Sequence, residues 1–156
     1  MIANIRIRAD GQSSALCPLD LMKFGIDDVR QRMKERGIAN DSFFICGFYD
    51  WGIDTVLTLE EAYLLKTAII GFYDGDDYVV RHMLRNHKPI SEVISHYYRF
   101  LSKDEVEVMQ HLLRNQEVSS VVEFFFKANN WISALQLYIN QGLILNTKKG
   151  FYIQVI

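Results

Sequence analysis

Two stretches of the chain are copies of one another, and this internal repeat constrains the fold more than any single residue does. Residues 79–86 (VVRHMLRN) align without a gap to residues 108–115 (VMQHLLRN). After a one-residue gap at Pro89, residues 90–94 (ISEVI) match 118–122 (VSSVV), and 97–99 (YYR) match 125–127 (FFK). The shared positions are mostly apolar at helical spacing, as in duplicated supersecondary units. The sequence therefore predicts a helical hairpin that occurs twice.

The residues before the repeats predict a small sheet with one helix. Residues 4–8 (NIRIR) alternate apolar and polar side chains, which indicates a half-buried strand that the segment 11–14 breaks. Apolar Ile26, Val29 and Met33 predict an amphipathic helix over 26–36 that ends at Gly37. The apolar run 42–49 (SFFICGFY) predicts a second strand that pairs with the first.

From Thr58 onwards the apolar spacing is helical. Thr58 and Glu61 form a capping-box pattern, so we expect a helix over 59–72, followed by a turn at 74–77 (DGDD). The repeats predict helices over 78–86, 90–100, 104–115 and 119–127, with Asn86 and Asn115 as left-handed caps. A helix over 131–141 and a β-hairpin over 143–155 complete the chain.

The predicted fold class is therefore α+β. A small N-terminal sheet with one helix is followed by duplicated helical hairpins, then by a C-terminal helix and β-hairpin in a winged-helix-like order. We expect a small α/β subdomain over residues 1–57 and a helical repeat region ending in the hairpin over 58–156.

Composition predicts an ordered protein with an aromatic core. Aromatic residues make up 13% and charged residues 23% of the 156 residues, which excludes a disordered chain. No apolar run is long enough to span a bilayer and residues 1–14 lack a signal-peptide core, so we expect a cytoplasmic protein without membrane association. Cys17 and Cys46 are far apart in sequence and predict two buried thiols.

Charge is distributed unevenly along the chain. Residues 37–80 hold eight acids against one base, Lys66, whereas the whole chain has a formal net charge of −2. The negative electrostatic field of such an acidic segment repels nucleic acid or attracts a basic partner. The candidate partner-binding carboxylates are Asp41, Asp50, Asp54, Glu60, Glu61, Asp74, Asp76 and Asp77.

No pattern in the sequence indicates catalysis, a cofactor or a metal. The chain lacks GxxxxGK[ST], GxGxxG and GxSxG, and its serines have no assigned base. His82 and His111 occupy equivalent repeat positions, which predicts two partly buried structural histidines. The acids at 74–77 lack the rest of a calcium-binding loop. We therefore expect no enzymatic activity, no cofactor and no metal.

Residues 119–155 follow the order of a winged helix, with Lys148 and Lys149 at the tip of the wing. In such modules the second helix enters the major groove and needs Arg or Lys to contact phosphates and bases. The corresponding helix here, 131–141 (WISALQLYINQ), contains no base. The segment therefore remains an alternative candidate, either as a transcriptional regulator that contacts DNA through Lys148 and Lys149 or as a protein-interaction adaptor.

Residues 40–51 (NDSFFICGFYDW), after a strand and an amphipathic helix and before 57–61 (LTLEE) and helical hairpins, resemble the ArdA antirestriction family. Members look similar in having a strand with an aromatic-acidic tip, a Leu-Glu-Glu helix and segments such as 90–94 (ISEVI). The resemblance covers roughly residues 4–100. It implies a protein of mobile genetic elements that mimics DNA with surface carboxylates. Such a protein occupies the DNA groove of a type I restriction-modification enzyme and so evades host defence.

Members of that family are acidic throughout, whereas acids dominate here only between Asp41 and Asp77. We expect mimicry to be confined to that segment. The expected function is thus a non-enzymatic inhibitor that binds a DNA-binding host defence complex and does not bind nucleic acid directly. A homodimer is a candidate assembly.

Overall fold

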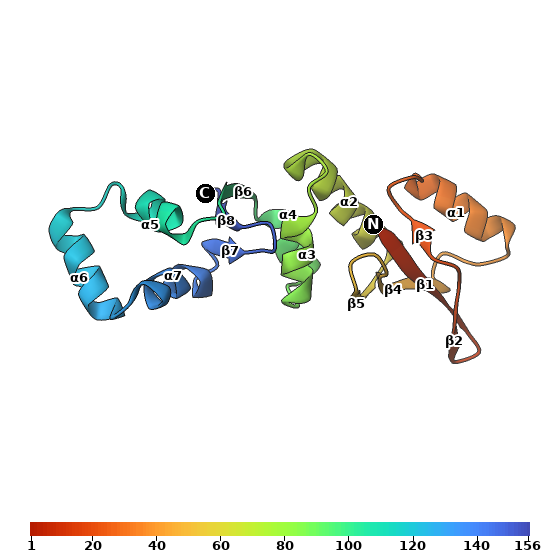
Figure 1. Cartoon of the computed structure of the whole chain (residues 1–156). Helices are drawn as coiled ribbons and strands as arrows, with labels where there is room; N and C mark the ends of the chain where they lie inside the picture. The colour runs from red at the N-terminus through yellow and green to blue at the C-terminus, as the bar shows by residue number, and fades with distance from the viewer. The chain divides into compact units, whose positions relative to one another are not determined.

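The structure, a computed structural model, describes the backbone of all 156 residues and the side chains of all except Trp131 and Ile132. The mixed α+β class is confirmed (Figure 1). Contacts divide the chain into two units, Met1–Ser95 (unit 1) and His96–Ile156 (unit 2). The division expected after residue 57 thus falls inside unit 1.

Unit 1 contains an antiparallel sheet in which β2, β1, β4 and β5 are successive neighbours, and β3 pairs with the start of β1. Because side chains in β1 alternate between the two faces of the sheet, Ala3 and Ile5 are buried on the same face. Ile5 lies opposite Ile45 of β4. The predicted pairing of these two strands is confirmed. The strands are β1 (Ile2–Ala9), β2 (Gln12–Ala15), β3 (Leu19–Asp20), β4 (Phe43–Phe48) and β5 (Ile53–Leu57).

The sequence pattern missed the other three strands of this sheet. The expected break at 11–14 is instead a tight turn into β2, with Asp10 and Gly11 in the left-handed region (φ 51° and 74°). β3 is two residues long, and β5 follows a turn that contains Gly52 (φ 61°). These strands depend on pairing with β1 and β4, so their own short sequences carry little periodic signal.

Four helices belong to unit 1, and the second of them, α2, begins with a reciprocal side-chain cap. In α2, Glu61 N–H donates to Thr58 Oγ1 (3.1 Å) and Thr58 N–H to Glu61 Oε2 (2.8 Å), which confirms the capping box. α2 buries Leu59, Leu65 and Ile69 and contacts β4. The helices are α1 (Ile26–Glu35), α2 (Leu59–Tyr73), α3 (Tyr78–Arg85) and α4 (Ile90–Ser95).

Unit 2 has three helices and a sheet of order β6-β8-β7. Its core consists of Val108 and Met109 from α5, Ala134 and Leu135 from α7, and Ile144 and Phe151 from the hairpin. The predicted C-terminal hairpin is confirmed. The elements are β6 (Tyr98–Ser102), α5 (Glu105–Leu113), α6 (Val118–Ala128), α7 (Trp131–Asn140), β7 (Ile144–Asn146) and β8 (Phe151–Gln154).

Both repeats contain a pair of helices, but the copies diverge in their second halves. The expected helix over 90–100 is wrong beyond Ser95, because Tyr98 begins β6, whereas the matching residues 125–127 remain helical in α6. Phe100 lies opposite Tyr152, and their ring centres are 5.4 Å apart in an edge-to-face arrangement. The Tyr98 hydroxyl donates to Gly142 O (3.0 Å). Pairing with β8, which is distant in sequence, therefore overrides the local helical pattern.

The left-handed caps predicted at the two asparagines are also wrong. Asn86 ends α3 at φ −89°, and its side-chain amide donates to His82 O. The next residue, His87, takes the left-handed conformation at φ 55°. Asn115 is not among the residues with positive φ. The turn between α3 and α4 is thus displaced by one residue from the expected position.

Candidate functional site: the carboxylates of residues 41–77

The eight predicted carboxylates of unit 1 fall into two groups. Asp41, before β4, Asp54, in β5, and Asp74, at the end of α2, have exposed side chains. Among the described residues, none of these three side chains forms an ion pair or a hydrogen bond. The other five, described next, have partners within unit 1. The acidic segment therefore offers fewer free carboxylates than its sequence indicates.

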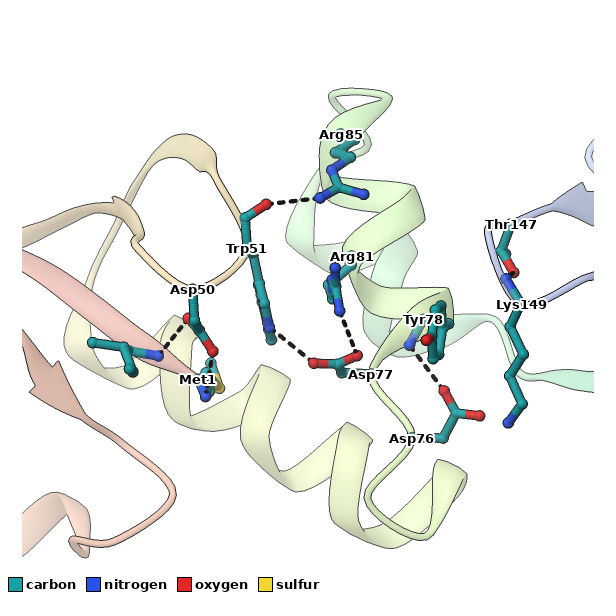
Figure 2. Close-up of polar contacts among 11 residues, drawn as sticks. Met1, Asp50, Trp51, Asp76, Asp77, Tyr78, Arg81, Arg85, Thr147 and Lys149 are labelled. Carbon is teal, nitrogen blue, oxygen red and sulfur yellow. Dashed lines mark hydrogen bonds and ion pairs between the residues drawn. The ribbon is translucent and has the colours of Figure 1, made fainter.

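Asp50 is bound to the start of the chain. Its carboxylate pairs with the Met1 amino group at 2.9 Å (Figure 2) and accepts the Ile2 N–H at 2.7 Å. Partial burial pushes the pKa of Asp50 up, but the hydrogen bonds from Met1 and Ile2 outweigh it and hold the pKa below its ordinary value. The contact fixes β1 against the turn that follows β4, so Asp50 has a structural role.

Asp77 links that turn to α3. Its carboxylate accepts the indole N–H of buried Trp51 (2.9 Å) and pairs with Arg81 (3.2 Å). Arg85, one turn further along α3, donates to Trp51 O (2.7 Å). These four residues form a connected polar network around the indole (Figure 2). Asp76 lies beside it and accepts the Tyr78 N–H (2.9 Å) at the start of α3.

The two glutamates at the start of α2 also have partners. Glu60 pairs with Arg30 of α1 at 2.6 Å, and the hydrogen bond from Arg30 holds the pKa of Glu60 below its ordinary value. The same bond raises the pKa of Arg30. Glu61 accepts the Thr58 N–H in the capping box. Both glutamates also lie in the first turn of α2, where negative charge is favourable.

Lys66, the base within the acidic segment, has a role that the sequence pattern did not indicate. Its ammonium donates to Leu21 O (2.6 Å) and Phe24 O (3.0 Å) and lies 5.2 Å from the centre of the Tyr63 ring. It thus joins α2 to the segment between β3 and α1. Its one signal in the sequence is a single cation on a helix that is apolar on nearly every face.

His82 and His111 are both partly buried, as expected. Burial, and then the guanidinium of Arg85, lower the pKa of His82; burial, and then Arg114 and Arg99, lower the pKa of His111. The first histidine belongs to unit 1 and the second to unit 2. Among the residues that the structure describes, no group of three or more His, Cys, Asp or Glu side chains is placed to hold a metal ion.

The alternative site lies in unit 2. Lys148 is exposed in the turn between β7 and β8, whereas Lys149 is half-buried with its ammonium 5.6 Å from the centre of the Phe100 ring. Thr147 closes this turn by hydrogen bonds with Gly150. The exposed positions of α7 hold Gln136, Leu137 and Asn140, and the first two side chains of the expected recognition helix lie outside the described residues. The helix therefore offers amides and an apolar side chain to a ligand.

No protein-family model, curated protein or solved structure matches the chain. In the part of the chain that the structure describes, no helix is both long and apolar enough to cross a membrane.

Proposed function

We propose that this protein is a non-enzymatic, cytoplasmic antirestriction inhibitor that binds a DNA-binding host defence complex, such as a type I restriction-modification enzyme, through carboxylates of unit 1. The observation that carries the proposal is the exposure of Asp41, Asp54 and Asp74 without partners among the described residues. Carboxylates that are not neutralised locally attract the cationic residues with which such a complex holds DNA phosphates. The resemblance of residues 40–51 to the ArdA family supplies the class of partner.

The five other carboxylates contribute less to this surface. Asp50, Glu60 and Asp77 each pair with a cation of unit 1, which reduces the field they offer to a partner. Glu61 and Asp76 accept backbone N–H groups. We therefore assign partner binding to Asp41, Asp54 and Asp74 and structural roles to the other five.

A second candidate function is a protein-interaction adaptor that uses the winged-helix-like segment of unit 2. The observation in its favour is α6, which exposes Val118, Val122 and Phe126 at successive turns, with Phe126 88% exposed. Exposed apolar side chains at this spacing suit a protein partner and not a phosphate backbone. A regulator that contacts DNA would depend instead on Lys148 and Lys149.

A measurement of direct DNA binding separates the DNA-binding regulator from the inhibitor and the adaptor. We expect no binding of the full chain to a mixed-sequence duplex by fluorescence anisotropy at about 50 mM salt, a condition that favours phosphate contacts. A salt-sensitive binding curve that disappears in a Lys148→Glu, Lys149→Glu variant would instead establish the DNA-binding regulator. The double variant Arg114→Glu, Lys127→Glu is the control, because it changes the charge of unit 2 equally at the ends of α5 and α6.

A further inference from the structure

Unit 1 contains a cavity of about 280 Å³ between α1, β1 and the segment that includes β3. Its floor is apolar and consists of the buried side chains of Ile5, Val29 and Met33. Half-buried Leu16 and Phe24 extend the apolar wall. A cavity with this lining favours an alkyl or aryl group because such a group removes apolar surface from water.

The mouth of the cavity is cationic. Exposed Arg32 and Arg36 lie one turn apart at the end of α1, and Arg32 stacks on the Phe24 ring at 4.4 Å. Neither guanidinium forms an ion pair with any residue that the structure describes. The carboxylate in the lining, Asp20, is held by Lys23 (3.5 Å) and by the Met22 N–H (3.1 Å). The two guanidinium groups are therefore left to bind an anion.

We propose that this cavity binds a small amphipathic anion, namely a medium-chain alkyl carboxylate. At about 30 Å³ per water-sized group, its volume holds roughly ten non-hydrogen atoms, which is the size of octanoate. The alkyl chain lies on Ile5, Val29 and Met33, and the carboxylate accepts hydrogen bonds from Arg32 and Arg36, which suit planar anions. This site is separate from the carboxylates assigned to the inhibitor and does not depend on that function.

Calorimetric titration of the protein with octanoate, octanol and octylamine tests separately how the alkyl group and the negative charge of the ligand contribute to binding. We expect octanoate to bind with a Kd below about 1 mM, and octanol about tenfold more weakly because it lacks the ionic hydrogen bonds. Octylamine, whose charge is repelled, is expected to bind most weakly. Equal binding of octylamine and octanoate, or no binding of octanoate, would overturn the proposal.

Substitution of the arginines locates the carboxylate. The double variant Arg32→Gln, Arg36→Gln should bind octanoate at least about tenfold more weakly than wild type and should bind octanol with unchanged affinity. Lys34→Gln is a control for the loss of a positive charge, because Lys34 is on the same helix but lines a different hollow with Gln31 and Asn40. An equal loss in Lys34→Gln would indicate a nonspecific charge effect and contradict the assignment.

Cys17 offers an independent readout, since its exposed thiol lies in the cavity lining. In a Cys46→Ser background, saturating octanoate should slow the reaction of Cys17 with an aromatic disulfide reagent at least about threefold, whereas octylamine at the same concentration should not. An unchanged rate under conditions where octanoate binds would place the ligand elsewhere. Anionic phospholipid vesicles are expected not to protect Cys17; protection by vesicles and not by octanoate would reject a free carboxylate as the ligand.

Discussion

At the residue scale, Asp77 differs from the exposed carboxylates because it holds an indole and a guanidinium together. Asp77→Ala leaves the buried Trp51 N–H without its acceptor and Arg81 without its ion pair. We expect the free energy of unfolding to fall by about 1–3 kcal/mol, the usual cost of an unsatisfied buried polar group. Urea unfolding followed by circular dichroism measures this change.

Asp54→Ala is the matched control for Asp77→Ala, because it removes the same atoms from an exposed position. Its expected effect is within about 0.5 kcal/mol. If both variants lost the same stability, the contacts of Asp77 with Trp51 and Arg81 would contribute no more to the free energy of unfolding than an exposed carboxylate does. The same outcome would also undermine the division of the eight carboxylates into structural and free groups.

His82 makes the stability of unit 1 depend on pH. Burial and Arg85 lower the pKa of His82, so the folded chain binds the proton more weakly than the unfolded chain. The free energy of unfolding should therefore be highest above the ordinary histidine pKa of about 6.5 and should fall as pH decreases through it, until the folded-state pKa is passed. His82→Gln should flatten this fall between about pH 7 and pH 5.

The carboxylates with lowered pKa titrate at lower pH than His82, so they do not obscure the pH dependence of stability that comes from His82. The stability from Asp50 and Glu60 is present above their ordinary pKa of about 4 and is lost as pH falls further. Measurements of wild type and His82→Gln at pH 5 to 8 isolate His82. A slope that is equal in the two proteins, or stability that rises as pH falls, would show that protonation of His82 is not linked to folding.

At the element scale, Gly47 determines how closely β4 and β5 approach. A Cβ atom at Gly47 would collide with the carbonyl oxygen of Ile53, at the irregular step in the pairing of these strands. We expect Gly47→Ala to cost more than about 2 kcal/mol of unfolding free energy, because backbone atoms must move. Thermal unfolding by circular dichroism provides the measurement.

Gly71→Ala is the control, since nothing lies within 4 Å of a Cβ atom at that position in α2. Alanine favours the helix over glycine by about 0.5–1 kcal/mol, so this variant should be more stable than wild type. Tolerance of alanine at Gly47 would mean that β5 does not pair closely with β4.

Elements with a local signal were predictable from the sequence. The capping box at Thr58 and Glu61 begins α2 as expected, and the alternation around Ile5 identifies β1. Elements that form through distant pairing were not. β6 contains a segment that aligns with a helix, and its strand conformation comes from pairing with β8, whose partner residues lie 49 to 56 positions later in the chain. Helical spacing in one copy of a repeat does not reveal a strand partner elsewhere.

The candidate site was predictable in composition but not in geometry. The sequence identifies all eight carboxylates, yet it does not reveal that Asp50 meets the Met1 amino group or that Glu60 meets Arg30. Cys17 shows the same limit, because the expected buried thiol is exposed at the cavity, while Cys46 is half-buried. Partners distant in sequence decide whether a polar side chain is free.

At the scale of the whole molecule, the two units divide the candidate functions between them. Unit 1 holds the free carboxylates and the cavity, and unit 2 holds the exposed face of α6 and the basic turn. Substitutions in one unit can therefore serve as controls for the other. The control Glu105→Gln, Glu117→Gln, Glu123→Gln in unit 2 changes the net charge by the same amount as Asp41→Asn, Asp54→Asn, Asp74→Asn in unit 1. Asparagine also tolerates the left-handed conformation at Asp74.

Competition with DNA tests the proposed inhibition most directly. A labelled duplex is bound to a type I restriction-modification enzyme, and its displacement by the full chain is followed by fluorescence anisotropy at two salt concentrations. We predict displacement that weakens at higher salt, about tenfold less displacement potency for the Asp41, Asp54, Asp74 variant, and no change for the charge-matched control. Failure to displace the duplex, or equal loss in both variants, would contradict inhibition through these three carboxylates.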